Sequence, residues 1–251
     1  MTGLNEPAFE TLASASDYAK KYLIDIIEGN GDVKENLGLL GEELSHQLSW
    51  YEGTAYALPH LAAVFPKLSK DEQVTLIAEM GPAIAAQSQW PLEEGTEAYN
   101  EFFEGLANLK DKTKELAKDP EVWELLKNDA NTSFMFALGA LAVIGDMSHA
   151  YALWFLSGST WEEISAACEC GWNDETIYLP DEPDFINPME IEEWDGKSLD
   201  NEPVWLNGLL NMCNDNPISP CLPYIYGTVT CPQCGEEEPY WDLFKRFLEE
   251  Y

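Results

Sequence analysis

Two cysteine pairs constrain the fold of this chain more than any other feature. They read Cys168-Glu-Cys170 and Cys231-Pro-Gln-Cys234, and a glycine follows each pair directly. Glycine permits the positive φ with which a metal knuckle turns its backbone amides towards the thiolates. In a cytoplasmic protein, clustered cysteines bind metal more often than they form disulfides. We therefore expect these four cysteines to hold a structural zinc ion in a closed site.

The spacing of the two pairs leaves alternatives open. The strand-like residues 224–230 ahead of Cys231 resemble half of a zinc ribbon, but ribbons separate their knuckles by ~15–20 residues. Here 60 residues, 171–230, intervene, and the first pair is CxC. Reduced metal-free cysteines and a redox pair are the alternatives. Cys213 and Cys221 lack the knuckle context, so we expect buried thiols there, although the sequence does not decide whether either replaces a knuckle cysteine.

The charge of the chain restricts its partners. There are 46 acidic and 13 basic residues, a formal net charge of −33, and Arg246 is the single arginine. Clustered Lys and Arg supply most affinity for phosphate backbones, so direct binding to nucleic acid or to an anionic membrane is not expected. Basic protein surfaces and cations are the partners that such a charge attracts. The alternative is that the acidity serves only solubility.

Neither a membrane span nor a secretory leader is expected. No stretch approaches the roughly 18 uninterrupted apolar residues that a spanning helix needs. The most apolar segment, 134–156, contains Asp146 and His149. The first residues, MTGLNEPAFE, lack the basic start and apolar run of a signal peptide. We expect a cytoplasmic protein.

Apolar residues recur at helical spacing up to Ala167. Thr54, Ser69 and Thr160 are expected N-caps, and Ser69 and Thr160 each have a glutamate three residues later, as in a capping box. The Thr160 cap would open a short helix towards Cys168. Short connections between such helices favour antiparallel pairs that stack as in a solenoid. The other expected helices cover residues 18–27, 33–47, 96–118, 120–128 and 133–157.

The segment 44–61, LSHQLSWYEGTAYALPHL, carries a second motif. It resembles a signature of bacterial HEAT-like helical-repeat proteins, closely over residues 30–70 and more loosely over 8–160. The resemblance implies antiparallel HEAT-like repeats that act as a binding scaffold, in some such proteins as immunity proteins to secreted toxins. The matching positions are His46, Gln47, Tyr51, Thr54, Ala57, Leu58, Pro59 and Leu61.

The amino-acid composition of the chain changes after Cys168. Prolines and aromatic residues become frequent, and residues 168–251 carry 19 acidic and 3 basic residues. Strand-like pieces at 176–179 and 224–229 precede an expected helix at 241–251. The sequence thus predicts a mainly α fold, with antiparallel HEAT-like helical repeats in residues 1–167 and a small α+β zinc-knuckle module in residues 168–251.

Two runs in this module combine carboxylates with aromatic residues, a pairing that suits a Lys/Arg-rich partner. We expect a non-enzymatic module that binds a basic protein, in its sharpest form an immunity protein or inhibitor of a nucleic-acid-acting toxin. The alternative is a solvated acidic face over a local aromatic core. The oligomeric state stays open. The expected partner-binding residues are Glu190, Glu192, Glu193, Trp194, Asp195, Glu236, Glu237, Glu238, Trp241 and Asp242.

Two further functions stay open. Glu43 with His46 and Asp146 with His149 stand at i, i+3, so each pair could share a helix face and contribute to a metal-dependent enzyme. Packed, hydrogen-bonded histidines are the simpler interpretation, and HExxH, phosphate-loop, GxSxG and Rossmann motifs are missing from the sequence. A structural adaptor without a single partner is the third possibility.

Overall fold

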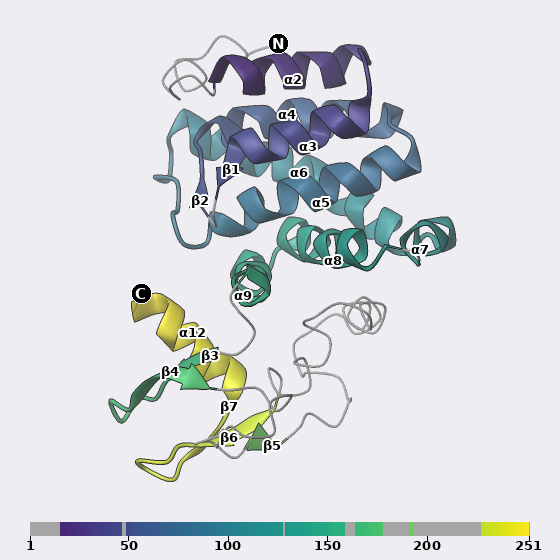
Figure 1. Ribbon diagram of the computed structural model, residues 1–251. Helices are drawn as coiled ribbons and strands as arrows, with labels where there is room; N and C mark the ends of the chain where they lie inside the picture. Colours follow the sequence, from purple (N-terminus) through teal and green to yellow (C-terminus); the bar gives the residue numbers. More distant parts are fainter. Residues whose placement is uncertain are drawn as a thin grey trace. The chain divides into compact units, whose positions relative to one another are not determined.

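The computed structural model describes residues 16–46, 49–127, 129–158, 164–177, 191–192 and 227–250. The chain forms two compact units, Met1–Trp154 and Phe155–Tyr251, and is mainly helical (Figure 1). Among the helices of these ranges, none has both the length and the apolar character needed to cross a membrane. The helices that begin in the first unit are α2 (Ser16–Glu28), α3 (Val33–Leu44), α4 (Gly53–Val64), η1 (Phe65–Lys67), α5 (Lys70–Ala86), α6 (Glu97–Ala117), α7 (Pro120–Leu126), α8 (Ala130–Ile144) and α9 (Met147–Gly158).

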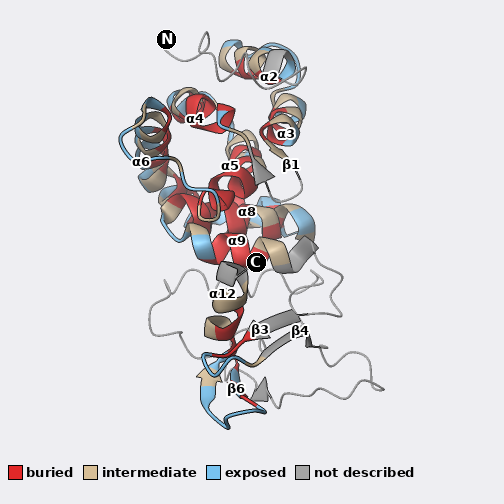
Figure 2. Cartoon of the chain, turned by 90° about the vertical axis from the view of Figure 1, so that its left-hand side faces the viewer, coloured by how far each residue is buried: buried red, intermediate tan, exposed pale blue. Residues whose placement is uncertain are grey.

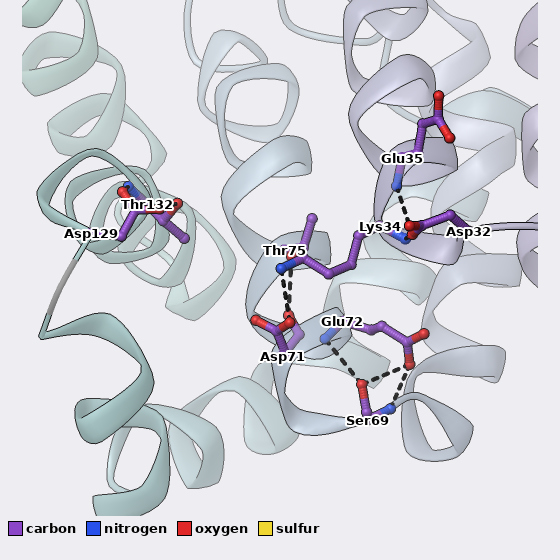
Figure 3. Close-up of polar contacts among 9 residues, drawn as sticks. All are labelled: Asp32, Lys34, Glu35, Ser69, Asp71, Glu72, Thr75, Asp129 and Thr132. Carbon is purple, nitrogen blue, oxygen red and sulfur yellow. Dashed lines mark hydrogen bonds and ion pairs between the residues drawn. The ribbon is translucent and has the colours of Figure 1, made fainter.

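Short polar caps begin several of these helices (Figure 3). The expected capping box of α5 is confirmed: the Glu72 amide donates to Ser69 Oγ at 3.3 Å, and the Ser69 amide donates to Glu72 Oε2 at 2.7 Å. Asp32 accepts from two amides at the start of α3, and Asp129 accepts from the Thr132 amide at the start of α8. Each cap satisfies amides that have no partner within the helix.

Helices of the first unit pack on their neighbours in the chain, as α2 does on α3, and also on helices further along it. Contacts join α2 to α4 and α4 to α6, and likewise α3 to α5 and α5 to α8. Buried residues concentrate on α4, α5 and α8 (Figure 2). A Cβ built on Gly139 of α8 would lie 2.0 Å from the Ile77 carbonyl oxygen of α5, and one on Gly81 would lie 2.5 Å from the Gly139 Cα. Only glycine allows this close approach of α5 and α8.

The start of α4 differs from the expected one. Thr54 is not the N-cap, because α4 already begins at Gly53 and the Thr54 side chain is buried, donating to the Leu44 carbonyl at 3.3 Å. Pro59 lies inside α4. There, Gly105 of α6 approaches the Leu58–Pro59 backbone so closely that a Cβ would be 2.8 Å from the proline nitrogen.

Two other expected helices are interrupted. The helix expected over 33–47 ends at Leu44, and β1 (Ser45–His46) pairs antiparallel with β2 (Ser49–Trp50). The helix expected over 133–157 is divided into α8 and α9 by Gly145, whose φ of +126° and N–H bond to the Leu141 carbonyl end α8. The left-handed backbone at Gly145 stops the helix despite the apolar periodicity on both sides.

The second unit contains short antiparallel strands and a C-terminal helix. β3 pairs with β4, and β5, β6 and β7 form a three-stranded sheet in that order. The expected C-terminal helix is confirmed as α12, whose Tyr240, Leu243 and Phe244 are buried, with the Tyr240 and Phe244 rings stacked 6.1 Å apart. The elements are β3 (Ile164–Ala167), β4 (Asn173–Ile177), β5 (Ile191–Glu192), β6 (Thr228–Thr230), β7 (Glu237–Pro239) and α12 (Tyr240–Glu250).

Residues just before Cys168 belong to the second unit. The structure divides the chain between Trp154 and Phe155, whereas the sequence places the boundary between 167 and 168. The short helix expected to run from Thr160 towards Cys168 is wrong for 164–167, because these residues form β3. Pairing with β4 ties this segment to the cysteine unit.

Candidate metal centre

The first knuckle is the turn between β3 and β4. The Cys168 amide donates to the Trp172 carbonyl at 2.8 Å, and the Gly171 amide returns to the Cys168 carbonyl at 2.9 Å. Gly171 adopts φ +87°, as the sequence predicts for the residue after a knuckle cysteine. This tight turn brings Cys168 and Cys170 to the same side of the hairpin end.

The second knuckle, between β6 and β7, repeats this arrangement. The Cys231 amide donates to the Glu236 carbonyl at 2.9 Å, and the Gly235 amide donates to the Cys231 carbonyl at 2.8 Å. Gly235 adopts φ +75°. The Gln233 side chain then reaches the Cys170 carbonyl at 3.3 Å, so the two knuckles also contact each other directly.

The four cysteine sulfurs converge between the knuckles. Cys168 Sγ lies 3.7 Å from Cys234 Sγ, Cys170 Sγ lies 3.8 Å from Cys231 Sγ, and all four lie within 4.8 Å of one another. A disulfide would need about 2.05 Å. Four thiolates placed tetrahedrally about 2.3 Å from one ion would lie about 3.8 Å apart. The sulfurs are therefore too far apart for disulfides, and the cluster could hold a metal ion.

Neighbouring groups shift the pKa of the thiols in opposite directions. The Cys170 amide lowers the pKa of Cys168, but burial and hydrogen bonds among the thiols raise it to about 12. Burial raises the pKa of Cys231, yet hydrogen bonds from the Cys234 and Gln233 amides and from the other thiols lower it to about 7. The lowered pKa favours the thiolate form of Cys231, which is the form that binds metal.

A carboxylate and a guanidinium lie against this cluster. Glu238 Oε1 is 3.9 Å from Cys168 Sγ, and Glu238 Oε2 forms an ion pair with Arg246 of α12. Glu238 is one of the expected partner-binding residues; its side chain is 17% exposed and pairs with Arg246. Reasoning from the sequence missed Arg246, although its being the single arginine of the chain was the available signal.

The other expected partner-binding residues are placed as follows. Glu236 and Glu237 are exposed beside the second knuckle. Trp241 is partly buried against Phe244, with ring centroids 6.1 Å apart, and Asp242 pairs with Lys245 at 2.7 Å. Glu192 lies on β5, opposite Thr228, without a described side chain. The remaining expected residues, Glu190, Glu193, Trp194 and Asp195, and also Cys213 and Cys221, fall outside the described residues.

The two carboxylate–histidine pairs, Glu43 with His46 and Asp146 with His149, are not arranged as the i, i+3 spacing predicts. Glu43 and His46 do not share a helix face, because α3 ends at Leu44 and His46 lies on β1. Asp146 Oδ1 accepts from the His149 amide at 3.0 Å at the start of α9, and its Oδ2 lies 3.8 Å from the His149 ring. Within the part of the chain that the structure describes, the four cysteines are the only group of three or more potential metal-ligating side chains.

No family model, no curated protein and no solved structure matches this chain. The resemblance of residues 44–61 to HEAT-like repeat proteins therefore stays a prediction.

Proposed function

We propose that Cys168, Cys170, Cys231 and Cys234 bind one zinc ion with a structural role. The observation that carries this proposal is the pair of sulfur–sulfur distances, 3.7 and 3.8 Å, which suit the edges of a tetrahedral tetrathiolate site. Four protein ligands leave no open position for a substrate or a water molecule, so such a site holds the fold instead of performing catalysis. Zinc content by elemental mass spectrometry, on protein purified without added metal, tests the proposal.

We further propose that the protein is a non-enzymatic binding protein for a basic protein surface. Glu236 and Glu237 are exposed directly after the second knuckle, and neither forms an ion pair with another described residue. A metal-held knuckle would present these carboxylates on a rigid turn, which lowers the entropic cost of binding. The net charge of −33 would speed the encounter with a basic partner and disfavour direct binding to nucleic acid.

The sharpest form of this proposal is an immunity protein or inhibitor. An acidic unit of this kind would occupy the basic groove with which a nucleic-acid-acting toxin holds phosphates. The HEAT-like scaffold belongs to the same proposal, because the packing of α2 on α4 and of α3 on α5 is the alternation found in stacked helix pairs. Such a scaffold would serve as a rigid support for binding.

The test of binding uses a matched loss of charge. Proteins that the immobilised chain retains at low salt are identified first. One retained protein is then produced separately, and calorimetry measures its affinity for the wild type and for two double variants, Glu236→Gln/Glu237→Gln and Glu104→Gln/Glu115→Gln. We expect the knuckle variant to weaken binding roughly tenfold or more, and the control, which removes two exposed carboxylates from α6, to change it little.

Two outcomes would contradict the binding proposal. Equal weakening by both variants would show that the acidity acts only through net charge. An affinity that does not fall with rising salt would exclude electrostatic recognition of a basic surface, since screening shortens the reach of exposed charges to about 8 Å at physiological salt. The adaptor interpretation instead expects that neither variant changes any interaction.

A further inference from the structure

Arg246 joins three elements around the first knuckle. From α12 its guanidinium forms an ion pair with Glu238 on β7, and its Nη2 lies 3.7 Å from Glu169 Oε1 within the knuckle. Nη1 donates to the carbonyl of Ala167, the last residue of β3, at 3.5 Å. The side chain of Arg246 is 28% exposed, so these contacts are partly shielded from water. One cation thus bridges the C-terminal helix and both hairpins that carry the cysteines.

Glu238 places a negative charge beside the first knuckle, where a cation would offset it. Its Oε1 lies 3.9 Å from Cys168 Sγ, so a carboxylate stands directly beside a metal-binding sulfur. A divalent ion with four thiolates carries a net charge of −2, so the site would repel a further negative charge at this distance. Residues 168–251 contain only three basic residues, which are Lys197, Lys245 and Arg246.

We propose that Arg246 is the charge-balancing positioning residue of the metal centre. Its ion pair with Glu238 weakens the repulsion between that carboxylate and the Cys168 thiolate, and so raises the affinity for zinc. This inference rests on the proposed zinc site. It assigns to Arg246 a role in the outer shell of the site, since its guanidinium acts on the metal through Glu238 and not by ligation.

Arginine suits this geometry better than lysine does. A guanidinium offers five donors in a planar fork, so it can engage Glu238, Glu169 and the Ala167 carbonyl together. A lysine ammonium is a compact charge, so it would still neutralise Glu238 but would not also contact Glu169 and the Ala167 carbonyl. Arg246→Lys is therefore expected to retain part of the effect.

The test compares zinc affinities measured by competition with a chromophoric chelator. We expect Arg246→Gln to weaken affinity by about 10–100-fold, the range typical of outer-shell substitutions, with Arg246→Lys between that variant and wild type. The decisive variant is Arg246→Gln/Glu238→Gln, which removes the carboxylate along with its cation and should recover most of the affinity. Lys245→Gln is the matched control, because Lys245 is the neighbouring cation on α12 and pairs with Asp242; we expect less than about a twofold change.

Cobalt substitution shows whether the four ligands remain in each variant. Thiolate-to-cobalt charge-transfer bands at saturation should be unchanged in all variants, since none replaces a ligand. Wild-type affinity in Arg246→Gln would overturn the inference, and so would equal losses in Arg246→Gln and Lys245→Gln. Absence of recovery in the double variant would show that Arg246 acts through packing instead of charge. If wild-type protein binds no zinc, the proposed site itself is wrong, a result that is distinct from all of these.

Discussion

Cys168 Sγ lies 3.7 Å from Cys234 Sγ although the two cysteines are 66 positions apart in the chain. The partner pair, Cys170 and Cys231, is 61 positions apart in the chain, and its sulfurs lie 3.8 Å apart. Each short contact therefore joins one knuckle to the other, and a bound ion would cross-link the β3–β4 hairpin to the β6–β7 hairpin. A cross-link that closes so long a loop restricts the unfolded chain strongly.

Removing one ligand should release the metal and unfold the second unit. For Cys231→Ser we expect loss of one equivalent of zinc by elemental mass spectrometry and loss of part of the thermal unfolding signal, with the α2–α8 helices retained. Structural zinc contributes about 10–16 kcal/mol of binding free energy in small domains, so its loss cannot be offset locally. Cys168→Ser should behave in the same way.

The controls for this prediction are Cys213→Ser and Cys221→Ser, which we expect to keep the full zinc content. Loss of zinc in either control would add that cysteine to the ligand set. Iron or manganese that survives in both Cys231→Ser and Cys168→Ser would instead support the enzyme alternative.

Gly139→Ala should destabilise the first unit severely. The new Cβ would lie 2.0 Å from the Ile77 carbonyl oxygen, a backbone atom that can move only with α5 itself. Overpacking a core typically costs about 1–3 kcal/mol, and we expect a value at or above the upper end, measured as the fall in the urea midpoint.

The matched control is Gly38→Ala on α3. A Cβ built there meets nothing within 4 Å, so the change should act only through helix propensity and stabilise the protein by about 0.5–1 kcal/mol. If the two alanine variants shifted the midpoint in the same direction, the close crossing of α5 and α8 would not be the cause.

Glu79 should make stability depend on pH. Burial, and secondarily the charge of Glu42, raise the pKa of Glu79 above its ordinary value of 4.5. The folded state then holds this proton more tightly than the unfolded state, so the free energy of unfolding falls as pH rises from the ordinary pKa through the raised one.

For Glu79→Gln we expect higher stability than wild type at neutral pH and equal stability below the ordinary pKa. Because the side chain is partly solvated, the gain should be below about 1 kcal/mol. Thermal unfolding as a function of pH measures it, with exposed Glu104→Gln as the control. A gain that persisted unchanged at acidic pH would have a cause other than ionisation.

Ser69→Ala should cost about 1 kcal/mol of unfolding free energy. The substitution leaves the Glu72 amide without its cap and removes one half of the reciprocal pair at the start of α5. Ser69→Thr keeps the hydroxyl, which both accepts from the Glu72 amide and donates to the Glu72 carboxylate at 2.8 Å, and should retain most of the stability. Urea midpoints of the two variants check this, and equal midpoints would mean that the cap contributes nothing.

Local signals accounted for much of the fold. The capping box at Ser69, the turn glycines Gly171 and Gly235, and the helix beginning near Trp241 depend on residues a few positions apart, and all were predictable. Gly145 divides one expected helix through its own backbone conformation, whereas other misassigned elements involve a competing contact. Thr54 looks like a cap but lies inside α4 and bonds Leu44, ten residues earlier.

The sequence alone determined which residues are candidate ligands and how each knuckle turns, because a short cysteine spacing followed by glycine restricts the local backbone. It also determined the mainly helical character through apolar periodicity. Only the tertiary structure decided that Cys168 meets Cys234, that Arg246 stands behind Glu238, and that Gly81 and Gly139 let two helices touch. These contacts join residues that lie far apart in the chain or on different elements, so packing selects them and no local pattern encodes them.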